Sequence, residues 1–132
     1  MAAASKKQMK RVGIEFYGNQ TGTMQISEFP FGTTTWAEVE ATRHEGETGF
    51  ALWRTRRFGE IRVRMVEYSP GYVADHWCLK GHILLCLEGE LRTELRDGSV
   101  WILKAGMSYQ VGDEVMGHRS SSEGGARLFI VD

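Results

Sequence analysis

Hydrophobic and polar residues alternate with a period of two over most of the chain after residue 50. This alternation is typical of β-strands that bury one face, because successive side chains of a strand point to opposite sides. Eight such runs are interpreted as strands, over residues 50–58, 61–68, 73–78, 82–88, 91–96, 100–103, 108–111 and 127–131. Glycine-containing turn sequences separate them, among them Gly59-Glu60, Glu88-Gly89 and Asp97-Gly98. So many short strands predict an all-β sandwich or barrel.

One short helix is predicted before the strands. Thr35 and Glu38 have the Ser/Thr-x-x-Glu spacing at which a hydroxyl and a carboxylate cap the first turn of a helix. The pattern predicts a helix over residues 36–43.

The first part of the chain differs from the rest in charge. Residues 1–23 hold four Lys and Arg residues and one Glu, whereas the whole chain has 16 basic and 17 acidic residues. We interpret residues 1–23 as a flexible basic arm and residues 24–132 as a single domain, which suits a chain of 132 residues. The balanced charge of the whole chain argues against a nucleic-acid partner.

The chain shows no sign of a membrane-spanning or secretory segment. Its longest apolar run, residues 83–87, is far shorter than the roughly 20 residues of a membrane helix. Residues 1–23 lack the apolar centre of a secretory signal, and two cysteines without a disulfide pattern suit a reducing compartment. We therefore expect no membrane partner and a cytoplasmic location.

Three metal-competent side chains, His76, Cys78 and His82, fall within seven residues. If residues 79–81 form a three-residue hairpin turn, Cys78 lies opposite His82 and the three side chains share one face of the sheet. Two imidazoles and a thiolate can then converge on one ion. A fourth ligand has to come from elsewhere, and the remaining histidines are His44 and His118.

Each of these residues also has an ordinary structural explanation. A histidine can be exposed in a turn or hydrogen-bonded in the core, and a cysteine can be buried as a small hydrophobic residue. The clustering of all three on one face favours a site. Cys86 would lie opposite Ala74 in the same hairpin and is interpreted as part of the core, unpaired with Cys78.

A run of arginines precedes this cluster. Arg62 and Arg64 alternate with Ile61, Val63 and Met65. Because the two sets point to opposite faces, we expect the arginines to lie on a solvated face of the sheet.

The cluster resembles a known sequence motif. Gly71, His76-x-Cys78, three residues, His82, six residues and Gly89 resemble the first motif of the cupins, written Gly, five residues, His-x-His, three or four residues, Glu, six residues, Gly. Here Cys78 replaces the second His and His82 replaces the Glu. The segment from Ala74 to His82 is similar to that of small single-domain cupins with an Asp-His-Cys-Trp type motif.

The resemblance extends over residues 29–132. In the second cupin motif His118 stands at the position of the metal-binding His, whereas Asp113, Val115 and Ser122 replace the expected Pro, Gly and Asn. The resemblance implies a double-stranded β-helix, a jelly-roll cupin barrel with one short N-terminal helix. It also implies a metal ion at the barrel mouth, with the ligands His76, Cys78, His82 and His118.

Three imidazoles and a thiolate form a softer ligand set than three imidazoles and a carboxylate. This favours zinc first, iron(II) next and copper as a further possibility. Groups that could orient the ligands or contact a bound molecule are Asp75, Glu88, Tyr109 and Arg119. Each of these could equally be a surface charge or a rim aromatic.

Two functional hypotheses follow from the resemblance. The first is a metal-binding small cupin that holds a small organic ligand at the barrel mouth, as an oxygenase or an isomerase. The second is a non-catalytic module with a structural metal or a ligand-sensing role. No catalytic residue is assigned in either. Cupins of this size imply a homodimer, which would also protect free sheet edges.

Overall fold

The structure is a computed structural model that describes residue 26 and residues 29–132. The predicted basic arm over residues 1–23 lies outside the described residues. Within them, the chain forms one short 3-10 helix and a set of β-strands. The elements are η1 (Trp36–Glu38), β2 (Ala41–Glu45), β3 (Phe50–Phe58), β4 (Ile61–Tyr68), β5 (Tyr72–Val73), β6 (His82–Leu95), β7 (Val100–Lys104), β8 (Ser108–Val111), β9 (His118–Ser122) and β10 (Ala126–Val131).

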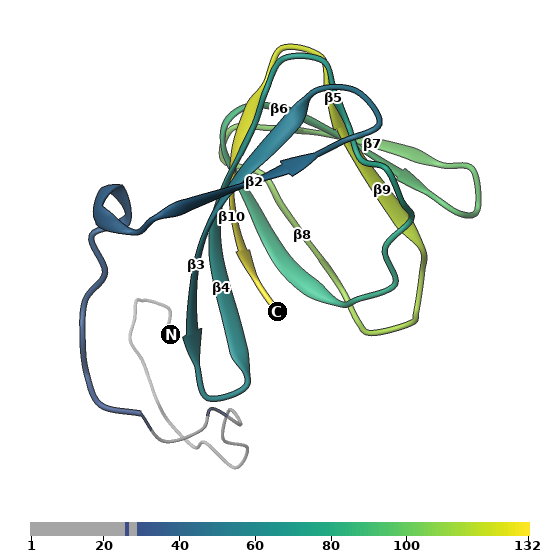
Figure 1. The fold of residues 1–132 in the computed structure, drawn as a ribbon. Helices are drawn as coiled ribbons and strands as arrows, with labels where there is room; N and C mark the ends of the chain where they lie inside the picture. Colours follow the sequence, from purple (N-terminus) through teal and green to yellow (C-terminus); the bar gives the residue numbers. More distant parts are fainter. Residues whose placement is uncertain (1–25, 27–28) are drawn as a thin grey trace, which may run out of the picture.

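The strands form an antiparallel sheet that curls around a common interior (Figure 1). The hydrogen-bonded order is β2-β3-β4-β10-β6-β9-β5, and β7 and β8 also pair with β6. The first half of β6 pairs with β10 and β8, and its second half pairs with β7 and β9. One long strand therefore joins the two halves of a jelly-roll barrel, as the all-β prediction requires.

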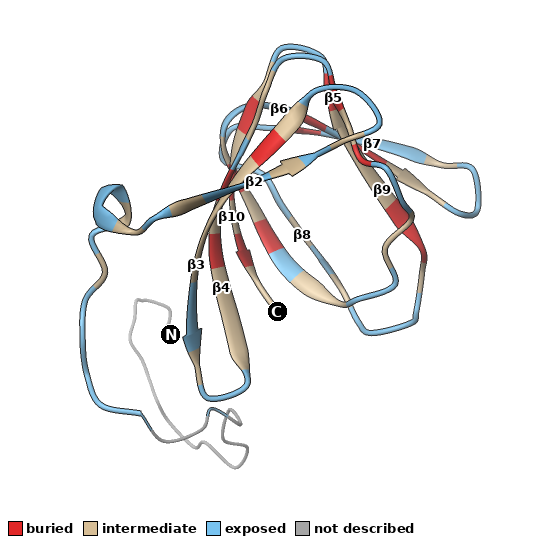
Figure 2. Ribbon diagram, viewed as in Figure 1, coloured by how far each residue is buried: buried red, intermediate tan, exposed pale blue. Residues whose placement is uncertain are grey.

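The core lies inside this curl. Buried side chains recur at alternate positions of β10, where Ala126, Leu128 and Ile130 are buried, and they meet Val66 of β4 and Leu84 of β6 (Figure 2). This alternation confirms the strand assignment and defines which side of each strand faces the interior. In the part of the chain that the structure describes, no helix is long and apolar enough to cross a membrane.

The predicted helix is present only as a single turn. Residues Trp36–Glu38 form η1, and Thr35 makes no side-chain capping hydrogen bond. The prediction that the helix continues to residue 43 is wrong, because Val39 is already extended and Ala41 starts β2, which pairs with β3. Hydrogen bonds to a neighbouring strand outweigh a weak local helix signal.

The strands predicted over 50–58, 61–68 and 108–111 have the same bounds in the structure. The turn predicted at Glu88-Gly89 is wrong, because the chain continues through it as β6. The pairing of β6 with β10 shifts by one residue at Leu87, between the paired residues Cys86 and Glu88, which marks a β-bulge. Gly89 has φ of 77°, and a Cβ on it would lie 2.2 Å from the carbonyl oxygen of Gly125. The glycine thus provides a positive φ and a close backbone approach near the bulge.

The predicted hairpin over residues 73–88 is also wrong. The strand ends at Val73, and Cys78 forms an isolated bridge with His118, whereas His82 pairs with Val111. Residues 79–81 therefore connect two segments that pair with different strands. Cys86 pairs with Leu128 and not with Ala74, but its assignment to the core is confirmed, since its thiol is free and the residue is fully buried.

Candidate functional site

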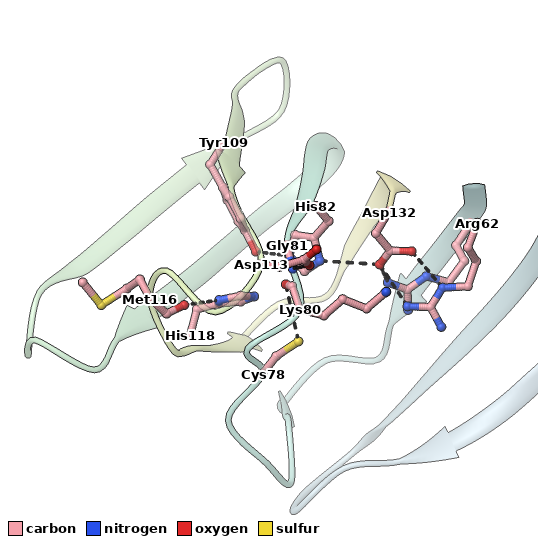
Figure 3. Close-up of polar contacts among 11 residues, drawn as sticks. Arg62, Cys78, Lys80, Gly81, His82, Tyr109, Asp113, Met116, His118 and Asp132 are labelled. Carbon is pink, nitrogen blue, oxygen red and sulfur yellow. Dashed lines mark hydrogen bonds and ion pairs between the residues drawn. The ribbon is translucent and has the colours of Figure 1, made fainter. Parts of the chain in front are cut away.

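A cavity of about 300 Å³ opens into the interior of the barrel. Its walls come from β3, β4, β5, β6, β8, β9 and β10 and from the connection between β5 and β6. Several polar groups of the cavity wall lie close together, among them His82, Tyr109, Asp132 and Arg62 (Figure 3). This size is at the lower end of the range for small-molecule sites in proteins.

All four residues of the expected metal set line this cavity. Two backbone hydrogen bonds of 2.8 and 3.0 Å join Cys78 to His118 of β9. His82 begins β6, and its ring contacts that of His118 edge-on, with 4.9 Å between the ring centroids. His76 lies in a bend with 71% of its side chain exposed, and its Nδ1 is 2.7 Å from the carboxylate of Asp75. Cys78 therefore lies next to His118 through the backbone and His82 lies next to it through its ring, by way of β9 and not through a hairpin.

His118 is held with one ring nitrogen free. Its Nδ1 lies 2.9 Å from the carbonyl oxygen of Met116, and because a carbonyl can only accept, Nδ1 carries the hydrogen. The neutral ring then has a lone pair on Nε2, which is buried and has no hydrogen-bond partner among the described residues. Burial lowers the pKa of His118, which the hydrogen bond to Met116 offsets only in part. The neutral ring is therefore the favoured form.

His82 lies between a phenol and a carboxylate. Its Nε2 is 2.9 Å from the hydroxyl of Tyr109, and its Nδ1 is 3.7 Å from Oδ2 of Asp132 (Figure 3). Burial raises the pKa of Tyr109, so the phenol keeps its proton at neutral pH. At 3.7 Å the nitrogen is beyond hydrogen-bond distance of Asp132, and it is buried without another partner in the described part of the chain.

Asp132 binds two arginines of β4. Arg62 donates two hydrogen bonds of 2.9 Å to its two carboxylate oxygens, and Arg64 donates one of 3.0 Å. The Asp132 side chain is 1% exposed. Burial alone would raise the pKa of this carboxyl, but the nearby His82 ring, the hydrogen bonds from Arg62 and the charges of both arginines hold it well below its usual range. Asp132 is therefore an ionised, buried carboxylate.

The expectation that Arg62 and Arg64 face solvent is wrong. Arg64 is buried, and both residues line the cavity. They share their face of β4 with Val66, a core residue, so the face that the arginines occupy is the interior of the barrel. Sequence reasoning missed this pair and Asp132. The available signal was two like charges at alternate positions of one strand, which need a counterion when they are buried.

The other expected site residues are divided between the cavity and the surface. Tyr109 and Arg119 line the cavity. Asp75 is exposed, and its carboxylate contacts the ring of His76. Glu88 is exposed, forms an ion pair of 3.2 Å with Arg127 and does not line the cavity. The structure thus brings Tyr109 and Arg119, but not Glu88, to the site.

The side chains do not form a ready metal site. In residue 26 and residues 29–132, no three His, Cys, Asp or Glu side chains stand together as a ligand set. The thiol of Cys78 faces the carbonyl oxygen of Lys80 at 3.8 Å, and His76 is turned to Asp75. The donor types and the two buried, unpartnered ring nitrogens of His82 and His118 fit a soft transition metal. His76 in its present position does not.

Comparison with known proteins gives structural matches only. No protein-family model and no curated protein matches the chain. An RmlC-like cupin from Shewanella frigidimarina shares 25% identity over 82% of this chain and 92% of its own, with a TM-score of 0.57. A predicted oxalate decarboxylase from Thermotoga maritima shares 16% identity over 76% of this chain and 96% of its own, with a TM-score of 0.66. The chain has the cupin fold.

A third match is the structure of Fe(II)-HppE with an alternative substrate. It shares 14% identity over 77% of this chain and 60% of its own, with a TM-score of 0.64. The fold of this chain thus also occurs in a protein whose structure is described as an Fe(II) form. At this identity the match itself shows the fold alone, and any function has to be argued from the site.

Proposed function

We propose that this cupin binds one divalent transition metal and a small organic ligand in the cavity of its barrel. His82, His118 and Cys78 would hold the ion, and His76 would join them by turning away from Asp75. The observation that carries the proposal is the pair of adjacent, buried imidazoles that each keep one ring nitrogen without a partner among the described residues. Buried polar atoms without partners are rare and often mark an absent ligand or ion.

The metal would act as a Lewis acid that polarises the bound molecule. The protein's own contribution is a neutral His118, fixed in one tautomer by Met116, and a thiol suited to zinc, iron(II) or copper. Oxygenation and isomerisation are the first reactions to assay. A structural metal without turnover would use the same residues, and would be recognised by a chelator that lowers the stability of the barrel while no bound water exchanges on the ion.

Elemental analysis tests the metal part of the proposal. The full chain is purified without chelator and without nickel affinity resin, supplied with zinc or iron(II), and compared with the His82→Ala/His118→Ala double variant. We expect about one ion per chain in the wild type and a loss of binding in the double variant. His44→Ala is the matched control, because His44 stacks on Trp53 and does not line the cavity. Full retention of metal by the double variant would overturn the proposal.

A second candidate is proton transfer without a metal, as in an isomerase. The contacts Asp132–His82–Tyr109 favour it, since a carboxylate near one ring nitrogen and a phenol on the other can orient a histidine as a base beside an acid. This candidate requires Nδ1 of His82 to carry the hydrogen in metal-free protein. Long-range proton–nitrogen NMR of the ring reports the tautomer, and a hydrogen on Nε2 would rule this candidate out.

A further inference from the structure

The wall of the cavity carries more cationic than anionic side chains. Of the described residues that line it, four are Lys or Arg and one is a carboxylate, Asp132. Arg119 is already paired with Glu94 at 3.4 Å and with Glu47 at 3.8 Å. Lys80 is exposed, so the buried positive charge comes from Arg62 and Arg64, which share the side-chain carboxylate of Asp132.

Arg64 is built into the wall as a donor with unused capacity. It is 6% exposed, and its guanidinium lies over the ring of Trp53, 4.3 Å from the ring centroid. Trp53 in turn stacks on His44. Asp132 accepts from Nη2 of Arg64, whereas Nε is buried without a hydrogen-bond partner among the described residues. A buried donor without an acceptor destabilises the free protein, and a ligand oxygen would relieve that cost.

The remaining walls are apolar or aromatic. They include the side chains of Val66, Tyr68, Tyr72, Leu84 and Ile130. Burial raises the pKa of Tyr68, so its phenol stays neutral at physiological pH. The cavity wall thus combines cationic and uncharged surface, and both constrain what can bind.

We propose that the ligand of this cavity is a small organic carboxylate whose carboxylate group binds Arg64 and whose apolar part packs against the aromatic wall. A carboxylate matches the planar guanidinium in shape. The apolar part of such a molecule also suits the uncharged wall, whereas inorganic phosphate has no apolar part. The proposal rests on the proposed function only in placing the ligand in this cavity, and it does not depend on the metal.

The test uses three probes on the full chain after removal of metal with a chelator and dialysis. Benzoate supplies a carboxylate on an apolar ring, benzamide is its neutral counterpart of the same shape, and inorganic phosphate supplies an anion without an apolar part. Proton–nitrogen NMR follows the backbone amides of His82, Tyr109 and Arg64. We expect saturable shifts with benzoate and binding of benzamide and phosphate that is weaker by about tenfold or more.

Arg64→Gln should weaken benzoate binding by about ten- to a hundredfold, and Arg64→Lys by less, because the charge remains. Arg92→Gln is the matched control, since the Arg92 side chain is 49% exposed and does not line the cavity. Equal binding of benzoate and benzamide by the wild type would overturn the proposal, even if the Arg64 variants fail to fold. Tighter binding of phosphate than of benzoate would also overturn it.

The metal content of the same samples separates the two proposals. Benzoate binding by metal-free protein supports the carboxylate site whatever the elemental analysis shows. Stoichiometric metal without a preference for benzoate over benzamide leaves the metal proposal standing and overturns this one.

Discussion

Replacing Asp132 by alanine should destabilise the barrel strongly. The side chain is 1% exposed, and it accepts three hydrogen bonds from two arginines, whose side chains are 19% and 7% exposed. The substitution leaves two guanidinium groups close together without their counterion. Removal of one partner from a buried ion pair costs about 3–5 kcal/mol. A domain of this length has a free energy of unfolding of roughly 5–15 kcal/mol, so the loss is a large share of the total.

Urea unfolding followed by tryptophan fluorescence measures this effect, with an unchanged slope as the sign that both proteins unfold in the same way. Glu123→Gln is the control, because Glu123 is exposed and its side chain makes no ion pair or hydrogen bond with the described residues; it should shift the free energy of unfolding by no more than about 0.5 kcal/mol. A second substitution, Arg64→Met, should restore part of the loss in the Asp132 variant, because it removes one of the uncompensated charges. A loss below about 1 kcal/mol for Asp132→Ala would refute the reasoning.

Three further predictions concern the pH profile, the bulge and the assembly. Burial lowers the pKa of His118 and of His44 from 6.5, so the unfolded chain takes up protons that the folded chain does not. This contribution to the free energy of unfolding should therefore be fully present above about pH 6.5 and be lost as the pH falls below it. Urea unfolding at several pH values should show a less steep loss in His118→Gln than in the wild type. The same dependence of the free energy on pH in both proteins would contradict this. Gly89→Ala should lower the free energy of unfolding by at least about 1–2 kcal/mol, because the position has positive φ and a carbonyl group close by. Gly124→Ala should leave it nearly unchanged in the same assay, because a Cβ at Gly124 would have no atom within 4 Å. We expect a homodimer in light scattering, since Ile83 and Trp101 are each 61% exposed, and a monomer mass at micromolar concentration would end that expectation.

The strand pattern was largely readable from the sequence, because alternation depends on neighbouring residues. The strands at 50–58 and 61–68 were predicted with their observed bounds. Gly89 was misread as a turn because a turn and a strand position with positive φ both favour glycine, and only the partner strands distinguish them. The strand His118–Ser122 was not predicted, since it is mostly polar and pairs with residues far away in the sequence.

The sequence predicted only part of the site, because the residues of the site come together through pairings between distant parts of the chain. The spacing in the sequence identified His76, Cys78 and His82. Cys78 and His118, however, are brought together by a backbone pairing between residues 40 positions apart in the sequence. Asp132 and its arginines are about 70 residues apart. The alternation in β4 shows that two faces exist, but it does not show that the face with Arg64 is the interior of a closed barrel. That assignment needs the strands on both sides.

The central claim is that His82 and His118 hold a metal ion beside the cavity. The most direct measurement is an anomalous diffraction map at the zinc or iron absorption edge, from crystals of the full chain grown with that metal. We expect one strong peak at about 2.0–2.1 Å from a ring nitrogen of each histidine. A map in which the ion lies elsewhere, for instance on the exposed pair Asp75 and His76, with none between His82 and His118, would contradict it.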